Sequence, residues 1–234
     1  MQIKVKRVLD NPLSYLLLIY LVLNLLAYLT ALVNERFWQI EFLGNTWYVV
    51  LSYLVQTLLI FGVLAFLKIK NNWTLADFGF RKTPFLEAVG YITLAYLAYF
   101  TFSIAILILL EKLGWSQVPG FLSQESYLEV FGENTFGMVS LGLAALIVAP
   151  LSEEVLFRGY LLENFRKKWG IKTALVLSAL LFALFHFQIA SFFFLFLLGL
   201  LIGWVYLKSN SIWPCLVLHV LNNAAAFLIE LFLR

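Results

Sequence analysis

Two adjacent glutamates and an arginine lie at the end of a long apolar run, in the stretch APLSEEVLFRGYLLENF at residues 149–165. A charged side chain in the middle of a membrane costs about 2.5–3.5 kcal/mol on insertion scales, so such residues usually face a helix-bundle interior and need partners. Glu154 and Arg158 are four residues apart, share a helix face and can pair. Glu153 points about 100° away from Glu154 on a helix, so it needs a different partner.

Candidate partners lie in two later apolar segments. Glu153 and His186 are equally distant along the chain from an expected helix turn at 169–170, where a basic cluster precedes a glycine. At about 1.5 Å per residue, both lie roughly 25 Å from this turn, so an antiparallel hairpin places them at one level. His219 and Asn223 share a face of a further segment and reach a similar depth. We therefore predict one polar layer in the second half of the chain.

A carboxylate and an imidazole at one depth can hold and activate a water. Glu153 would be the general base and His186 would orient the water, while His219 and Asn223 could donate hydrogen bonds to the oxyanion of an attacked carbonyl. The two histidines and Glu153 also form the ligand set of many catalytic zinc sites, so a metal-dependent reaction stays open. Pro150, just before the glutamates, removes a backbone hydrogen bond and can kink or open the helix.

Each of these residues also has a purely structural interpretation. Glu154 and Arg158 are more simply explained as an ion pair that helps assembly, and a single interior histidine is usually satisfied by its neighbours. Asn222 and Asn223 can hydrogen-bond neighbouring helices. Glu153 has no cation on its own face and is the hardest to explain in this way, so the set as a whole favours a function.

The composition indicates a membrane protein. The chain is 63% hydrophobic and 12% charged, whereas soluble domains are about half apolar and about a quarter charged. Spanning helices need about 20 apolar residues, and the long run 173–207 must turn back near HFQIAS. We predict an all-α polytopic bundle of about seven spans, at roughly 13–33, 47–67, 86–110, 137–160, 171–187, 191–207 and 212–232.

The positions of the basic residues predict the orientation. Most of the 16 Lys and Arg residues flank span ends that are inside when the N-terminus is inside. We interpret 1–136 as N-terminal transmembrane helices with an outer loop, and 137–234 as the catalytic helical core of the same compact membrane domain. The only cysteine, Cys215, excludes an intrachain disulfide. The lipid bilayer is an expected partner and nucleic acid is not; no oligomeric state is predicted.

Three ordered motifs resemble those of the CAAX-protease and bacteriocin-processing family, also called the CPBP or Abi family. They are EEVLFR with Glu153, Glu154 and Arg158, then FALFH with Phe182 and His186, then HVLNN with His219 and Asn223. The resemblance covers about 137–229. The segment ADFGFRKTP before the third span also resembles a juxtamembrane stretch of that family.

This resemblance implies an intramembrane endopeptidase related to the eukaryotic CAAX-prenyl endopeptidase. It implies Glu153 and His186 as the water-activating pair and His219 with Asn223 as the oxyanion site. The supporting residues would be Glu154, Arg158, Phe182 and Asn222. It favours a glutamate-type mechanism without a cofactor over a zinc-dependent one. The implied substrate is a peptide or protein in a prokaryotic cell membrane, either prenylated and CAAX-like or otherwise membrane-associated.

Two other functions compete with the protease. A non-catalytic membrane scaffold or bacteriocin-immunity protein would keep the polar cluster for assembly. A small transporter or proton relay would also place Glu and His inside the membrane, although no inverted repeat is evident. We favour the protease because all three motifs occur in order.

Overall fold

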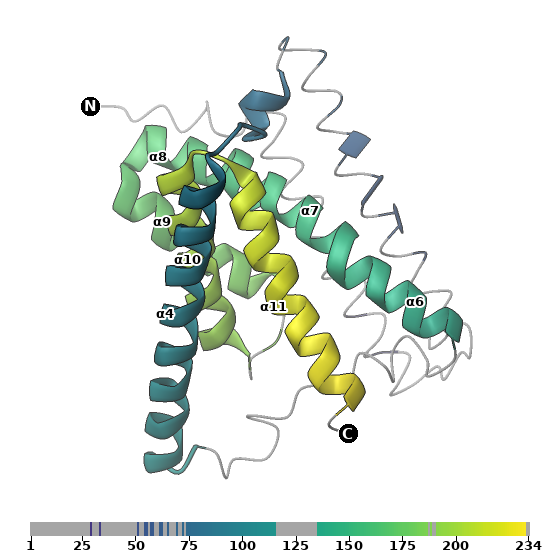
Figure 1. Ribbon diagram of the computed structural model, residues 1–234, viewed down its shortest axis with the longest axis vertical. Coiled ribbons are helices and arrows are strands. Elements are labelled where there is room, and N and C mark those ends of the chain that lie inside the picture. The colour runs from purple at the N-terminus through teal and green to yellow at the C-terminus, as the bar shows by residue number, and fades with distance from the viewer. Residues whose placement is uncertain are drawn as a thin grey trace. The chain divides into compact units, whose positions relative to one another are not determined.

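A computed structural model describes residues 74–115, 135–186, 188 and 191–232, together with scattered positions between 29 and 72. Every element printed in Figure 1 within these residues is a helix, which confirms the all-α class. The α-helices are α4 Phe85–Lys112, α6 Thr135–Leu143, α7 Ala149–Glu154, α8 Glu163–Trp169, α9 Ile171–Leu184, α10 Phe192–Ser209 and α11 Ile212–Phe232. The others are a 3₁₀-helix, η3 Leu75–Phe78, and two π-helical segments, η5 Ala144–Val148 and η6 Val155–Leu162.

Four helical stretches among the described residues are long and apolar enough to cross a membrane. They are Phe85–Lys112, Thr135–Trp169, Phe192–Ser209 and Ile212–Ile229. The shorter apolar helix α9 corresponds to the expected span 171–187. The expected spans 13–33 and 47–67, and most of the loop 111–136, lie outside the described residues. The chain is therefore a polytopic integral membrane protein, and the number of seven spans stays a prediction.

The chain divides into two compact units, one of 1–72 with 127–144 and one of 73–126 with 145–234. Within the second unit, α4 packs against α10 and α11. The expected division between residues 136 and 137 stays a prediction.

The helix that carries the glutamates changes register on both sides of α7. Backbone bonds in π-helical segments span five residues rather than four, and such segments are frequent at functional sites. Pro150 is the second residue of α7. All eight residues of η6 are buried, so this stretch is surrounded by protein on every side.

The hairpin predicted from the basic cluster is present. α8 ends at Trp169, and Gly170 has a φ of +81°, which favours glycine because it lacks a Cβ atom. α9 then begins at Ile171 and ends at Leu184. The chain reverses again before α10 begins at Phe192, which confirms the turn near HFQIAS.

Small residues allow α9 and α10 to lie close together. A Cβ atom on Gly199 would lie 3.0 Å from the Cα atom of Ala179, and one on Gly203 would lie 2.6 Å from the Cδ1 atom of Leu175. Small residues are used in this way at helix interfaces in membranes. The close approach brings the backbone of α10 within reach of the buried side chains of η6.

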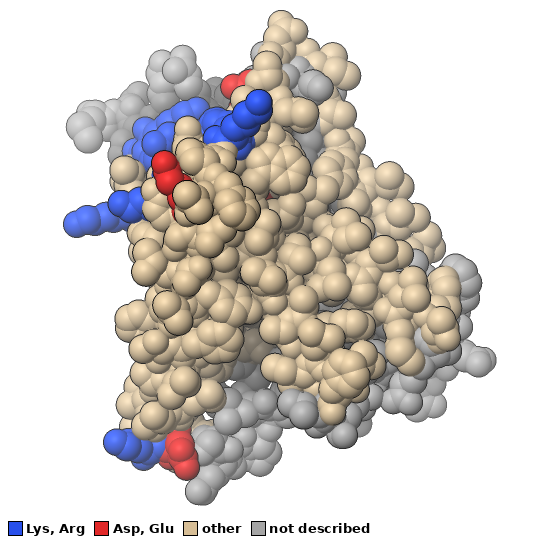
Figure 2. All heavy atoms as spheres, in the orientation of Figure 1, with Lys and Arg blue, Asp and Glu red and all other residues tan. Residues whose placement is uncertain are grey.

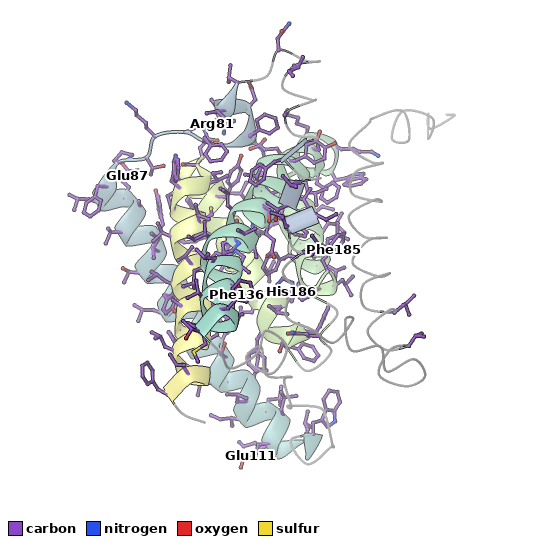
Figure 3. All side chains as sticks on the ribbon, turned by 90° about the vertical axis from the view of Figure 1, so that its right-hand side faces the viewer. Arg81, Glu87, Glu111, Phe136, Phe185 and His186 are labelled. Carbon is purple, nitrogen blue, oxygen red and sulfur yellow. The ribbon has the colours of Figure 1, made fainter. Side chains whose placement is uncertain are left out.

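The segment before α4 is tied to the turn between α10 and α11. The N–H of Ile212 donates to the carbonyl of Gly79 over 2.9 Å. The hydroxyl of Ser211 donates to the carbonyl of Arg81, and the Arg81 guanidinium donates to the Asn210 side chain. Figure 3 labels Arg81 in this segment. The motif ADFGFRKTP therefore fastens the start of α4 to the helix that carries His219 and Asn223.

η3 also presses directly on η6. A Cβ atom on Gly159 would lie 2.2 Å from the carbonyl oxygen of Phe78, so this contact requires glycine. The start of η3 is closed by Thr74, whose N–H and hydroxyl donate to Asp77 Oδ2 over 2.7 and 2.8 Å. The backbone hydrogen bond from Thr74 holds the pKa of the Asp77 carboxyl below its usual value.

Basic side chains gather at one end of the second unit (Figure 2). They include the last turns of α8 and α10, with Arg166, Lys167, Lys168 and Lys208. Glu111, labelled in Figure 3, lies at the other end of α4. This asymmetry is typical of a membrane protein whose basic end faces the cytoplasm. The N-terminus-inside orientation stays a prediction.

Candidate active site

Glu153 lies near the end of α7 and faces both histidines of the chain. Its Oε2 atom is 3.9 Å from Nε2 of His186 and 3.8 Å from Nε2 of His219. These distances exceed those of direct hydrogen bonds. Glu153 Oε2 is nevertheless buried and has no hydrogen-bond partner within the part of the chain that the structure describes. Glu153 and His186 thus lie at one level, as predicted from their equal distances along the chain from the turn at 169–170.

His186, which is labelled in Figure 3, follows the last turn of α9. Its ring is held by the backbone. Its Nδ1 atom is 2.7 Å from the carbonyl oxygen of Phe182. Because a carbonyl oxygen can only accept, we assign the hydrogen of the neutral ring to Nδ1. Nε2 is then an acceptor, and it is this atom that faces Glu153. The His186 side chain is 22% exposed, against 14% for Glu153 and 3% for His219, so the site is most accessible on the His186 side.

Glu154 is fully buried and receives two donors on one oxygen. Oε1 lies 3.1 Å from a guanidinium nitrogen of Arg158 and 2.7 Å from Nδ1 of His219. Arg158 is also fully buried, and its second terminal nitrogen donates to the carbonyl of Gly199 over 3.1 Å. One carboxylate and one guanidinium therefore connect α7, η6, α10 and α11.

The contact between Glu154 and His219 was not predicted from the sequence. The spacing of four residues revealed the pair of Glu154 and Arg158, which the structure contains. Residues that are 65 positions apart have no such signal, because their contact depends on how two helices are rotated against each other. The equal depth of the two segments was the only available sign.

Phe182 lies fully buried between the charged pair and the histidines. The centroid of its ring is 4.6 Å from the guanidinium carbon of Arg158. The rings of His186 and His219 have centroids 4.7 and 5.6 Å from it. A cation over an aromatic ring gains about 0.5–2 kcal/mol, the larger value applying to desolvated sites. Phe182 thus supports the positions of both imidazoles, beyond offering its carbonyl to one of them.

Asn223 lies one turn after His219 on α11, and its side-chain amide donates to the carbonyl of Ala145 over 2.9 Å. The amide nitrogen carries two hydrogens, so one N–H remains for another acceptor. Asn222, predicted as a supporting residue, makes none of the contacts described above. Asn223 is therefore the asparagine that the structure connects with the helix of the glutamates.

The zinc alternative needs a set of ligands that converge on one point. No group of three or more His, Cys, Asp or Glu side chains in the described ranges is placed so that it could hold a metal ion. Glu153, His186 and His219 have the right donor chemistry for zinc, and Glu153 Oε2 lies 3.9 and 3.8 Å from the two imidazole nitrogens. Chelation tests the zinc alternative.

Comparison with known proteins bears on residues 135–225. This segment matches the family described as Type II CAAX prenyl endopeptidase Rce1-like. This part of the chain is therefore similar to the CAAX-protease family. The match contains α7, η6, α9 and most of α11, and thus all eight residues singled out from the sequence.

The chain is also similar to a curated protein, the UPF0177 protein YxdF of Lactococcus lactis. The two are 33% identical over 93 residues, which is 38% of this chain and 51% of the relative. The chain thus aligns with about half the length of that relative. The bacterial source of the relative agrees with the predicted prokaryotic membrane. No solved structure matches the chain.

Proposed function

We propose that this protein is an intramembrane endopeptidase of the CAAX-protease type that hydrolyses peptide bonds with a water activated by Glu153 and His186. The observation that carries this proposal is the position of Glu153 Oε2. It is buried, faces two imidazole nitrogens at 3.8–3.9 Å and has no hydrogen-bond partner among the described residues. A separation of this size between polar groups suits a bridging water. The family match supports the reaction class.

Glu153 acts as the general base, and His186 orients the water. The carboxylate accepts one hydrogen of the water. The other hydrogen is donated to Nε2 of His186, which is an acceptor because Nδ1–H is held by Phe182. These two hydrogen bonds direct a lone pair of the water oxygen at the carbonyl carbon. General-base catalysis of this kind contributes about 10²–10⁴ in rate.

His219 and Asn223 stabilise the negative charge that develops on the carbonyl oxygen. His219 donates from Nε2 while its Nδ1–H remains bound to Glu154, so in this step the ring carries a hydrogen on both nitrogens. Asn223 donates the N–H that is not used by Ala145. Removing one oxyanion donor typically costs about 10²–10³ in rate.

The proton balance closes within the site. Glu153 takes a proton as the water oxygen bonds to the carbonyl carbon. When the C–N bond breaks, that proton passes from Glu153 to the departing amine. The products are two peptides, one with a new carboxyl end and one with a new amine end. No covalent intermediate forms, so the buried Cys215 has no part in the reaction.

The proposed substrate is a membrane-associated peptide or protein, and a prenylated CAAX-like C-terminus is the first candidate. The description of the matching family supports this choice. The site is also carried by helices that are apolar enough to cross a membrane. An attached prenyl chain would bring the scissile bond into that apolar environment.

The test is the cleavage of a quenched fluorescent prenylated CAAX peptide by the detergent-purified protein. We expect Glu153→Gln and His186→Ala to lower kcat by about 10²–10⁴ without a loss of folded protein. Glu87→Gln is the matched control, because Glu87 is exposed in the first turn of α4. The same peptide without its prenyl group shows whether prenylation is needed.

Equal cleavage by wild type and Glu153→Gln would contradict the proposed base. If wild type cleaves neither peptide, further membrane peptides are screened against Glu153→Gln. Cellular function that survives Glu153→Gln would support the non-catalytic scaffold or immunity protein.

A further inference from the structure

The helix register changes immediately before Pro150. η5 spans Ala144–Val148 and is π-helical, and α7 begins at Ala149 with Pro150 as its second residue. In a π-helix, each carbonyl accepts from the N–H five residues later. For Ala145, that residue is Pro150, which has no N–H.

The register decides which carbonyl the proline leaves without its usual donor. In an α-helix it would be the carbonyl four residues earlier, at Leu146, which points about 100° away from that of Ala145 around the helix axis. In the π register it is the carbonyl of Ala145. This oxygen accepts the side-chain N–H of Asn223 over 2.9 Å.

We propose that Pro150 is a positioning residue for Asn223. By withholding a backbone N–H, it keeps the carbonyl of Ala145 available to the Asn223 amide. That hydrogen bond orients the amide and leaves its second N–H for the substrate. The catalytic part of this inference rests on the proposed function, whereas the hydrogen bond between Ala145 and Asn223 does not.

The direct test is the Asn223 side-chain resonance of protein labelled with ¹⁵N-asparagine in detergent, assigned by its loss in Asn223→Ala. In wild type we expect two well-separated NH₂ proton shifts, with one proton shifted downfield by the hydrogen bond. Pro150→Ala restores a backbone N–H that competes for the carbonyl of Ala145, so the two NH₂ proton shifts should become more similar. An unchanged Asn223 signal in Pro150→Ala would overturn the proposal, as would an averaged pair in wild type.

A matched control is available on α11. Pro214 is buried and is the third residue of that helix, where the N–H would lack an intrahelical acceptor in any case. Pro214→Ala should therefore leave the Asn223 signal unchanged. If Pro150→Ala does not yield folded protein, Pro150→Ser introduces the same backbone N–H and is measured instead.

Cleavage kinetics add a second readout. We expect Pro150→Ala to lower kcat by about 10- to 100-fold with KM nearly unchanged, because an oxyanion donor is displaced rather than removed. In the Asn223→Ala background, Pro150→Ala should have almost no further effect, since residues that act through one contact are not additive. If the effects of Pro150→Ala and Asn223→Ala on kcat multiply in the double variant, the positioning role of Pro150 is overturned. Absence of cleavage in wild type, with these and the further membrane peptides, would count against the proposed function alone, because the Asn223 signal still decides this inference.

Discussion

The imidazole of His219 is held by Glu154 across the interface of α11 and α7, with 2.7 Å between Nδ1 and Oε1. Both side chains are buried, and the same oxygen also binds Arg158. A buried charge is tolerated when it is paired and hydrogen-bonded. One carboxylate thus compensates a permanent cation and orients a residue of the proposed oxyanion site.

Glu154→Gln should be much more damaging than its small change in shape suggests. It leaves Arg158 buried without a counter-charge, which typically costs about 3–5 kcal/mol of unfolding free energy. Cleavage should fall as well, because His219 loses a charged partner. Thermal unfolding in detergent and kcat measure the two effects.

The control for Glu154→Gln is Glu163→Gln. The pair of Glu163 and Arg166 is partly exposed to solvent: the exposed fraction is 11% for the Glu163 side chain and 42% for the Arg166 side chain. Glu163 is largely buried, but its partner Arg166 reaches solvent. Pairs that reach solvent contribute about 0–1 kcal/mol, so we expect a smaller loss than in Glu154→Gln. Equal losses in both variants would contradict the special role of the buried pair.

Arg158→Lys should also reduce the yield of folded protein. The guanidinium binds Glu154 with one nitrogen and the carbonyl of Gly199 with the other. Lysine carries a single compact charge and cannot reproduce this planar two-ended contact. The unfolding midpoint and the yield measure the effect, and Arg166→Lys on the exposed surface is the control. Normal values for Arg158→Lys would show that the bridge to α10 is unimportant.

Gly159→Ala should separate η3 from η6. The added Cβ atom would lie 2.2 Å from the backbone oxygen of Phe78, which cannot move without shifting the whole segment. We expect a lower unfolding midpoint and faster proteolysis within 74–84. Gly90→Ala on α4 meets no atom within 4 Å and should be neutral or slightly stabilising, because alanine favours helices. Equal behaviour of the two variants would contradict the docking of η3.

Dialysis against a chelator should leave peptide cleavage unchanged, with the metal content measured before and after. The proposed reaction uses Glu153 and His186 alone to activate the water. Loss of cleavage that added zinc restores would instead identify Glu153, His186 and His219 as ligands. A chelator already saturated with zinc controls for direct effects of the reagent.

Much of the helical architecture could be predicted because it depends on local properties. The lengths of apolar runs placed α4, α10 and α11, and the glycine after a basic cluster placed the turn at Gly170. Equal spacing from that turn placed Glu153 and His186 at one depth. The spans before residue 72 stay predictions, since most of those residues are not described by the structure.

The π-helical register of η5 and η6 was not foreseen. Pro150 indicated a disturbed helix, but a proline alone does not determine whether the chain kinks or changes register. That choice depends on which neighbours can satisfy the freed carbonyl. Asn223, far away in the sequence, satisfies it at Ala145.

The sequence by itself determined that this is a helical membrane protein, and it predicted which residues carry its chemistry. Those conclusions follow from hydrophobic length and from residue types at fixed spacings. Only the tertiary structure decided that Glu153 faces both histidines and that Glu154 binds His219 as well as Arg158. The physical reason is that such contacts depend on helix rotation, close approach at glycines and the directions of individual donors, all of which arise when the helices pack.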